Sequence, residues 1–302
     1  MSIKSPITKT NNVKLVHSIQ TNRIISLYKN LGYDVQRFFE GLNVVDIYQC
    51  NDSKLKFYSP ASIAGDAKFY EALDNNTHNY YSDWKWEHEQ VIQFVKQNDN
   101  VLEVGCAYGN FLKHSLKRGA AHVCGLELNE HAIEVAQSNG LNVHSEMIES
   151  HAEHHANEYD LVCSFQVVEH ISELDNFISS SLKCLKPGGI FVISVPNNDC
   201  YLYKNDLDHV LNLPPHHMGL WTEESLLSIA NIYNLDVVDI KKEPALKENY
   251  GMYYEVFLRN TLKLDGWLKS LILVPTRPIV KLLMKIFPPK LGVCITAIYK
   301  KK

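Results

Sequence analysis

Two glutamates and two glycines have the types and the spacing that suit a nucleotide-like ligand. Glu103 lies in the apolar run Val101–Val104, two positions before Gly105. Gly109 follows four residues later, and glycine lets a backbone turn tightly and approach a ligand. Glu127 ends a second apolar run, at about the distance along a strand-helix-strand unit where an acid pairs with ribose hydroxyls. The G-x-x-x-G spacing is not the G-x-G-x-x-G of dinucleotide sites, so it indicates a different cofactor.

Three histidines have the chemistry of a general base. His170 follows an apolar run, and His216 and His217 lie in the segment Leu213–Thr222. A hydroxyl is a poor nucleophile until it loses its proton, and histidine suits that transfer near neutral pH. The alternatives are that His170 caps a helix and that the other two only bond backbone in a proline-stiffened loop. We predict catalytic roles for His170, His216 and His217, with one of the last two acting as the base or as a ligand of the acceptor.

The elements that must position these residues follow from a regular alternation between residues 100 and 240. Short apolar runs alternate there with helical patterns, which predicts a parallel sheet with right-handed crossovers. Strands are expected near residues 100–104, 122–127, 141–144, 159–164, 189–195 and 235–240.

Four stretches in this order resemble the motifs of the class I S-adenosylmethionine-dependent methyltransferases. They are Val101–Leu112, His122–Glu127, Tyr159–His170 and Leu185–Gly189. The resemblance implies an α/β, Rossmann-like fold with a seven-stranded, mostly parallel sheet and helices on both faces. It also implies S-adenosyl-L-methionine as cofactor. The family adds a final antiparallel strand, which we expect at Cys294–Tyr299, with Tyr253–Leu258 as a competitor.

The same resemblance assigns roles around the cofactor. Glu103 would hold the methionine amino group, and Glu127 would take both ribose hydroxyls. The other implied contacts are backbone at Gly105, Cys106, Ala107 and Gly109, an adenine site of Leu128, Met147 and Ile148, Gln166 at the methyl-donor end, and Tyr81 as a lid. Many members carry glycine where this chain has Ala107. Alanine is a small intrusion if the backbone there keeps a negative φ, and we expect binding to survive the substitution.

The chain divides into two expected parts. Residues 1–62 form an N-terminal accessory segment, with a helix around Val16–Asn30 and a strand around Lys54–Tyr58. Residues 63–302 form the methyltransferase domain. Its insertion, residues 260–291, is basic and amphipathic, which favours either peripheral contact with an anionic membrane or a cover over the domain.

The accessory segment and the P-P-H-H sequence at 214–217 are similar to those of bacterial sugar and polysaccharide-biosynthesis methyltransferases. This similarity implies O-methylation of a sugar or of a polysaccharide or cell-envelope precursor. One alternative is a quinone or small phenolic acceptor. Another, from a different functional class, is a non-catalytic scaffold that binds S-adenosylmethionine. In each enzymatic case the partner is a small-molecule or glycan acceptor.

Composition excludes several other classes. The formal net charge of −4 and the lack of RNA-binding or zinc-finger patterns argue against a nucleic-acid partner. The seven cysteines form no C-x-x-C pair and fit a reducing compartment. Residues 1–12 have no apolar core of a signal peptide, and no window is apolar enough to span a bilayer. We therefore predict a cytoplasmic protein.

Two groups of potential metal ligands also occur in the sequence. The first comprises Asn197, Asn198, Asp206 and Asp208, whose spacing is not diagnostic of a Mg²⁺ site. The second comprises His151, His154 and His155, which share a helical face and suit a solvated surface. We predict no metal.

Overall fold

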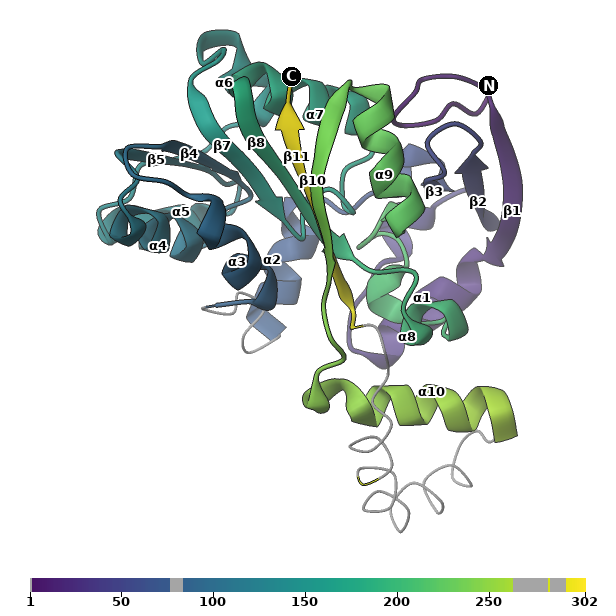
Figure 1. Ribbon diagram of the computed structural model, residues 1–302. Coiled ribbons are helices and arrows are strands. Elements are labelled where there is room, and N and C mark those ends of the chain that lie inside the picture. Colours follow the sequence, from purple (N-terminus) through teal and green to yellow (C-terminus); the bar gives the residue numbers. More distant parts are fainter. Residues whose placement is uncertain (1, 77–83, 263–281, 283–291) are drawn as a thin grey trace.

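Seven strands form the larger sheet of the computed structural model, which describes residues 2–76, 84–262, 282 and 292–302 (Figure 1). They are β4 (Asn100–Val104), β5 (His122–Leu126), β6 (Val143–His144), β7 (Tyr159–Phe165), β8 (Leu185–Pro196), β10 (Leu235–Lys242) and β11 (Cys294–Lys301). Their order across the sheet is β10-β11-β8-β7-β4-β5-β6. The pairs from β8 to β6 are parallel, and β11 is antiparallel to both of its neighbours. The predicted Rossmann-like sheet is confirmed.

The final strand has the expected position. β11 covers Cys294–Tyr299, whereas the competing segment Tyr253–Leu258 lies within helix α10 (Tyr250–Leu262). β11 inserts between β8 and β10, so it must bury both of its faces. Ala297 packs into the core on one face of the sheet and Ile298 into the core on the other. The nearly continuous apolar run at 294–299 meets that requirement.

Helices cover both faces of the larger sheet. One face carries α3 (Trp86–Val91), α4 (Asn110–Arg118) and α5 (Glu130–Ser138), and the other carries α6 (Ile148–His154), α7 (Leu174–Cys184) and α9 (Glu223–Ile232). Successive strand residues alternate between the two cores: Leu161 packs with Phe111 of α4, and Val162 packs with Phe177 of α7. Full burial of each such side chain contributes about 1.5–3 kcal/mol to folding.

The strand order creates a crevice between β4 and β7. From β4 the chain builds outward through β5 to β6, and it then returns to β7 on the other side of β4. The connections that leave these strands diverge, and ligands of open α/β sheets bind in the space between them. Glu103, Glu127 and His170 lie at or just beyond the carboxyl ends of β4, β5 and β7.

A smaller antiparallel sheet stands beside the larger one. Its order is β1-β2-β3-β9, with β1 at Val13–Gln20, β2 at Val44–Cys50, β3 at Lys56–Ser59 and β9 at Gly219–Leu220. The predicted helix at Val16–Asn30 is wrong in its first half, because α1 begins at Thr21 and ends at Asn30. Residues 13–20 instead pair along their length with β2, and this ladder satisfies their backbone groups. The predicted strand around Lys54–Tyr58 is confirmed by β3.

The N-terminal part holds the loop that carries two of the candidate histidines. Leu213 and Met218 of this loop belong to the core formed by β1–β3, α1 and α2 (Ala67–Asn76). The hydroxyl of Tyr28 donates to the carbonyls of Val210 and Leu213, at 3.0 and 2.9 Å. Because β9 completes the smaller sheet from within residues 63–302, the boundary near residue 62 stays a prediction.

The remaining elements lie around the ends of the larger sheet. Helix α8 (Tyr201–Asn205) packs against α10, as Figure 1 shows. Short 3₁₀ helices occur at Gln36–Phe39, Ala61–Ile63, Ile92–Phe94, Val210–Asn212 and Lys247–Asn249. All seven cysteines are buried and unbridged. Among the described residues, every helix is too short or too polar to cross a membrane. Apart from 260–262 and 282, the predicted basic insertion lies outside the described residues.

Candidate active site

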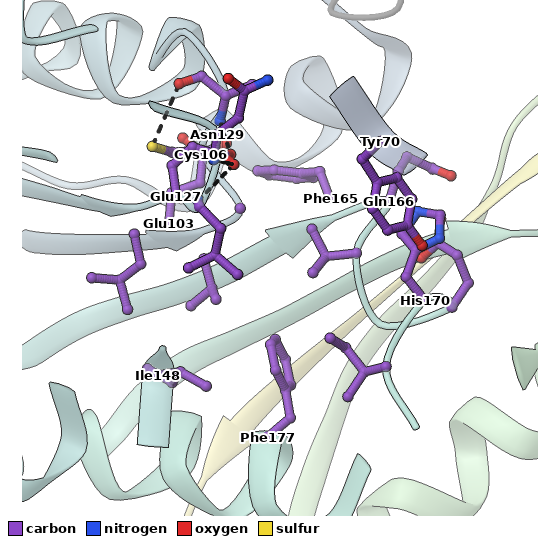
Figure 2. A pocket seen from close by; sticks show the side chains of 18 of the residues that line it. Tyr70, Glu103, Cys106, Glu127, Asn129, Ile148, Phe165, Gln166, His170 and Phe177 are labelled. Carbon is purple, nitrogen blue, oxygen red and sulfur yellow. Dashed lines mark hydrogen bonds and ion pairs between the residues drawn. The ribbon is translucent and has the colours of Figure 1, made fainter. Parts of the chain in front are cut away.

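A cavity of ≈ 520 Å³ occupies the crevice at the carboxyl ends of β4, β5 and β7. The predicted residues that line it are Glu103, Gly105, Cys106, Ala107, Glu127, Leu128, Met147, Ile148, Gln166, His170, His216 and His217. Figure 2 shows Glu103, Cys106 and Glu127 at one end and His170 with Tyr70 at the other. Gly109 starts α4 behind this lining, and Tyr81 lies outside the described residues. The cavity therefore brings together the predicted cofactor contacts and the predicted bases.

The two glycines of the turn after β4 are required by geometry. Gly105 has φ +75°, and a Cβ there would stand 2.4 Å from Cγ2 of Val167. Gly109 has φ +72°, and its Cβ would stand 2.3 Å from Cδ1 of Leu141. Both positions lie in the left-handed region that favours glycine, and both leave no room for a side chain. The backbone can thus pass close beneath a ligand.

Ala107 departs from the expectation. Its φ is +47°, so the condition of a negative φ, under which alanine would be a small intrusion, is not met. A non-glycine residue in this conformation costs about 1–2 kcal/mol, because its Cβ crowds the following carbonyl oxygen. The N–H of Ala107 donates to Oε2 of Glu127 at 2.8 Å, which helps to hold the turn. The glycine that many family members carry here suits this backbone better.

Glu127 is fixed by backbone amides. Its Oε1 accepts from the N–H groups of Leu128 and Asn129 at 2.8 and 3.0 Å, and its Oε2 accepts from Ala107. A carboxylate has about four acceptor positions, so three are already in use. The side chain is therefore held in one orientation at the cavity wall, and one acceptor position is left for a ligand hydroxyl.

Glu103 is a buried acid with an orphaned oxygen. Its residue is 3 % exposed, and Oε2 has no hydrogen-bond partner among the described residues. Burial raises the pKa of the Glu103 carboxyl well above its ordinary value, and the nearby charge of Glu127 adds to the rise. A cationic ligand group would supply both the missing donor and the missing opposite charge. The residues present thus fit the ammonium group of an amino-acid moiety such as that of S-adenosylmethionine.

The wall beyond Glu127 is apolar. Leu128 and Met147 are 55 % and 45 % exposed, although both are large hydrophobic side chains. Ile148 beside them is buried, and all three line the cavity. Exposed apolar surface within a cavity favours a flat apolar ligand group, as predicted for adenine.

Gln166 sits in a strained turn after β7. Its φ is +55°, and its side-chain amide donates to Oε1 of Glu87 and to Sγ of Cys294, both at 3.3 Å. These bonds tie the end of β7 to α3 and β11. Gln166 therefore lines the cavity with its amide already engaged.

The three candidate histidines meet at the opposite end of the cavity. Their ring centroids are 4.7 Å apart for His170 and His216, 5.0 Å for His170 and His217, and 4.4 Å for His216 and His217. Nδ1 of His170 donates to the carbonyl of His216 at 2.6 Å, and Nδ1 of His216 donates to the carbonyl of Leu211 at 2.9 Å. A carbonyl can only accept, so each of these Nδ1 atoms carries the proton and each Nε2 carries a lone pair.

The third ring has the same tautomer. Nδ1 of His217 lies 3.3 Å from Oδ1 of Asn212, whose amide nitrogen donates to Asn198 at 2.8 Å. Burial lowers the pKa of His170 to about 4 and that of His216 to about 3, and it lowers the pKa of His217 well below its ordinary value. All three rings are therefore neutral at pH 7.

Glu169 is a site residue whose role the sequence did not reveal. It is 1 % exposed, it lines the cavity, and its Oε2 has no partner among the described residues. Burial raises the pKa of the Glu169 carboxyl to about 8. Its Oε1 lies 3.9 Å from Nε2 of His170. The signal in the sequence is a glutamate directly before a histidine at the end of an apolar strand.

Other lining residues were not predicted. They are Asp66, Tyr70, Lys85, His88, Glu146, Phe165 and Tyr203. Tyr70, from α2, contacts the rings of His170 and His216 at centroid distances of 5.2 and 6.0 Å. The potential Mg²⁺ ligands Asp206 and Asp208 instead pair with Arg259 and Arg23.

Comparisons with known proteins agree with this geometry. The family model described as a methyltransferase domain matches residues 77–240. A ubiquinone biosynthesis O-methyltransferase of Hydrogenovibrio crunogenus is 30 % identical over 185 residues, covering 56 % of this chain and 73 % of the relative. One of the same name from Proteus mirabilis is 26 % identical over 182 residues, covering 53 % and 74 %.

A solved structure supports the fold. A SAM-dependent methyltransferase from Archaeoglobus fulgidus superposes with a TM-score of 0.51 at 19 % identity. The match covers 78 % of this chain and all of the other. The Rossmann-like arrangement of the larger sheet is thus one that occurs in a known structure.

Proposed function

The chain belongs to the methyltransferase domain family and is an S-adenosylmethionine-dependent methyltransferase. On this premise we propose that it methylates a hydroxyl oxygen on a small phenolic or quinone-precursor ring. The observation that carries the proposal is the single cavity that joins the Glu103–Glu127 end to the His170–Glu169 end. Donor and acceptor can be bound within it next to each other, which is what an in-line displacement requires.

The donor end fits the cofactor on three counts. Glu103 would take the ammonium group, Glu127 would accept from one ribose hydroxyl and not from both as predicted, and Leu128 with Met147 would contact the adenine. The glycine turn leaves space for the backbone to approach. When bound, S-adenosylmethionine supplies a methyl group on a positively charged sulfur, which makes its carbon electrophilic.

The acceptor end supports an acidic hydroxyl over a sugar alcohol. A phenolic hydroxyl has a pKa near 10, as in tyrosine. Transfer of this proton to His170, whose pKa is about 4, would be unfavourable by about 6 pKa units, or about 8 kcal/mol. Transfer to Glu169, whose pKa is about 8, would be unfavourable by only about 2 units, or about 3 kcal/mol. A sugar hydroxyl is a weaker acid, so its proton is harder to remove with any of these groups.

We therefore assign proton acceptance to Glu169. Its Oε2 would take the hydroxyl proton as the acceptor oxygen bonds to the methyl carbon, while the bond from that carbon to the cofactor sulfur breaks and S-adenosylhomocysteine leaves. His170, His216 and His217 position the acceptor with their lone pairs, which for His216 and His217 is the acceptor-ligand alternative of the sequence-based prediction. Tyr70, Tyr203 and other apolar lining residues offer surface for a ring.

The names of the curated relatives point in the same direction. Both enzymes are described as O-methyltransferases of ubiquinone biosynthesis, which supports oxygen as the accepting atom and a quinone-type ring as the acceptor. The expectation of a sugar or polysaccharide acceptor has no comparable support. Family membership also favours turnover over a non-catalytic scaffold.

The experiment is a competition between acceptor classes. Purified protein is incubated with S-adenosylmethionine and either dihydroxylated aromatic rings or nucleotide sugars, and S-adenosylhomocysteine and methylated products are measured by mass spectrometry. We expect O-methylated ring products. Methylation confined to nucleotide sugars, or cofactor binding without turnover on any acceptor, would reject the proposal.

A further inference from the structure

Three imidazole side chains from two distant segments converge at the acceptor end of the cavity. One ring nitrogen of each of His170, His216 and His217 lies within 4.8 Å of those of the other two. In the part of the chain that the structure describes, no other group of three or more histidines, cysteines or acidic residues meets this spacing. The cluster is also well buried, since His216 and His217 are 5 % and 4 % exposed.

The hydrogen bonds of the cluster select the tautomer that metals require. Each Nδ1 hydrogen is directed to a protein oxygen: the carbonyl of His216, the carbonyl of Leu211, or Oδ1 of Asn212. Each Nε2 therefore carries its lone pair. Metal-bound histidines generally donate their other ring N–H in this way, which fixes the orientation of the ring and raises its basicity as a ligand.

The spacing of the three ring nitrogens is close to what a single bound ion requires. The carboxyl group of Glu169 lies beside the cluster, with Oε1 3.9 Å from Nε2 of His170. A tetrahedral Zn²⁺ site has Zn–N distances of about 2.0–2.1 Å, which places ligand nitrogens roughly 3.3 Å apart. Because the ring nitrogens lie within 4.8 Å of one another, they would have to approach by up to about 1.5 Å.

We propose that His170, His216 and His217 bind one divalent transition metal ion, with a remaining coordination position that faces the cavity. Imidazole ligands favour Zn²⁺ and its neighbours over Mg²⁺, which prefers oxygen. The sequence-based prediction of no metal considered Asn197, Asn198, Asp206 and Asp208, and the histidines of residues 151–155, but not this cluster, and the proposal differs from it. This further step rests on the proposed function: the open coordination position would hold the oxygen of the acceptor. The ion would then orient the acceptor ring and make its hydroxyl more acidic.

Metal uptake tests the site without any acceptor. Protein freed of metal by a chelator is dialysed against Zn²⁺ or Mg²⁺, and bound metal is measured by plasma mass spectrometry. Co²⁺ is titrated in parallel, because its visible absorption reports the ligand geometry. We expect one equivalent of Zn²⁺ or Co²⁺, with a tetrahedral Co²⁺ spectrum, and no tight binding of Mg²⁺. Binding of Mg²⁺ alone, or of no metal, would overturn the proposal.

Variants locate the ion. His217→Ala and His170→Ala should each lower the affinity for Co²⁺ at least 10-fold, whereas His154→Ala, an exposed histidine on α6, should leave it unchanged. His217→Gln is a second variant that preserves much of the side-chain volume, and thermal unfolding verifies that each variant is folded. Equal binding by all variants would show an adventitious ion only and reject the site.

The outcome is separable from that of the proposed function. Binding of S-adenosylhomocysteine, followed by calorimetry, depends on the Glu103 end of the cavity and should not change in the histidine variants. If ring methylation persists in metal-free protein that takes up no Zn²⁺, the metal site fails and the proposed function stands. If Zn²⁺ binds but no acceptor is methylated on oxygen, the metal site stands and the proposed function fails.

Discussion

The backbone N–H of Ala107 donates to Oε2 of Glu127 across 2.8 Å, and this bond links the turn after β4 to the loop after β5. The donor sits in a left-handed conformation, with φ +47°, that alanine adopts at a cost of about 1–2 kcal/mol. Glu127 receives two further amide bonds on its other oxygen. The strained turn and Glu127, the acid that we propose for ribose binding, are therefore joined in one hydrogen-bonded unit.

Replacing Ala107 with glycine should stabilise the protein. The change removes the Cβ from a left-handed position, and we expect the free energy of unfolding in urea to rise by about 1 kcal/mol. The affinity for S-adenosylhomocysteine should stay within about twofold, because the N–H that meets Glu127 is retained. Gly105→Ala is the matched control in the same turn. Its Cβ would meet Val167 at 2.4 Å, so it should lose both stability and affinity. Destabilisation by Ala107→Gly would contradict this account.

Glu103→Gln should weaken cofactor binding without damaging the fold. A hydrogen bond to a charged group contributes about 1.5–3 kcal/mol, so calorimetry should show an affinity loss of about 10- to 100-fold. Ionisation of Glu103 opposes folding, because the pKa of its carboxyl is raised in the folded state. Its destabilising effect begins above the ordinary pKa of about 4.5 and grows as pH rises.

The glutamine variant cannot ionise, so at pH 8 its melting temperature should equal or exceed that of the parent protein. Glu130→Gln, an exposed position on α5, is the control for both measurements. An unchanged affinity in the Glu103 variant would remove this residue from the donor site.

Much of the donor site was predictable because its signals are local. Gly105 lies two residues from Glu103, and the turn that joins them to α4 is a single short stretch of chain. Glu127 closes the next strand, so one strand-helix-strand unit supplies both carboxylates. The strands of the larger sheet were predicted for the same reason, since burial on both faces leaves continuous apolar runs.

The acceptor end was less predictable because it depends on long-range contacts. His170 and His216 are 46 positions apart, and they meet only because the N-terminal core holds the loop between the 3₁₀ helix at Val210–Asn212 and β9. No local pattern reveals that pairing. At Val13–Gln20 a local pattern was present but misleading. The spacing of Val16 and Ile19 also fits a helix, and the pairing of this segment with β2 makes it a strand.

Glu169→Gln should remove the base. Positioned proton transfer contributes about 10²- to 10⁴-fold, so kcat should fall within that range while the KM for the cofactor changes little. In the parent protein the pKa of Glu169 is about 8 and the base must be ionised, so the methylation rate should rise with pH through about 8. The rise should be absent from the variant's pH profile.

Glu173→Gln, at an exposed position, should behave like the parent protein. A parent rate that does not change between pH 6 and 9 would exclude Glu169 as the base.

Tyr28→Phe should impair the acceptor end from a distance. The hydroxyl of Tyr28 donates to the carbonyls of Val210 and Leu213, which flank the segment that leads to His216. Loss of these bonds costs about 1–2 kcal/mol and leaves the segment less firmly held. The KM for the acceptor should therefore rise several-fold, whereas the affinity for S-adenosylhomocysteine should not change, because the donor end is built on β4 and β5.

Tyr33→Phe, a half-buried tyrosine that packs on the same N-terminal core, controls for general loosening of that core. If Tyr28→Phe weakened S-adenosylhomocysteine binding as much as it raised the KM for the acceptor, the prediction would be wrong. The N-terminal part would then stabilise the whole cavity and not only the loop that carries His216 and His217.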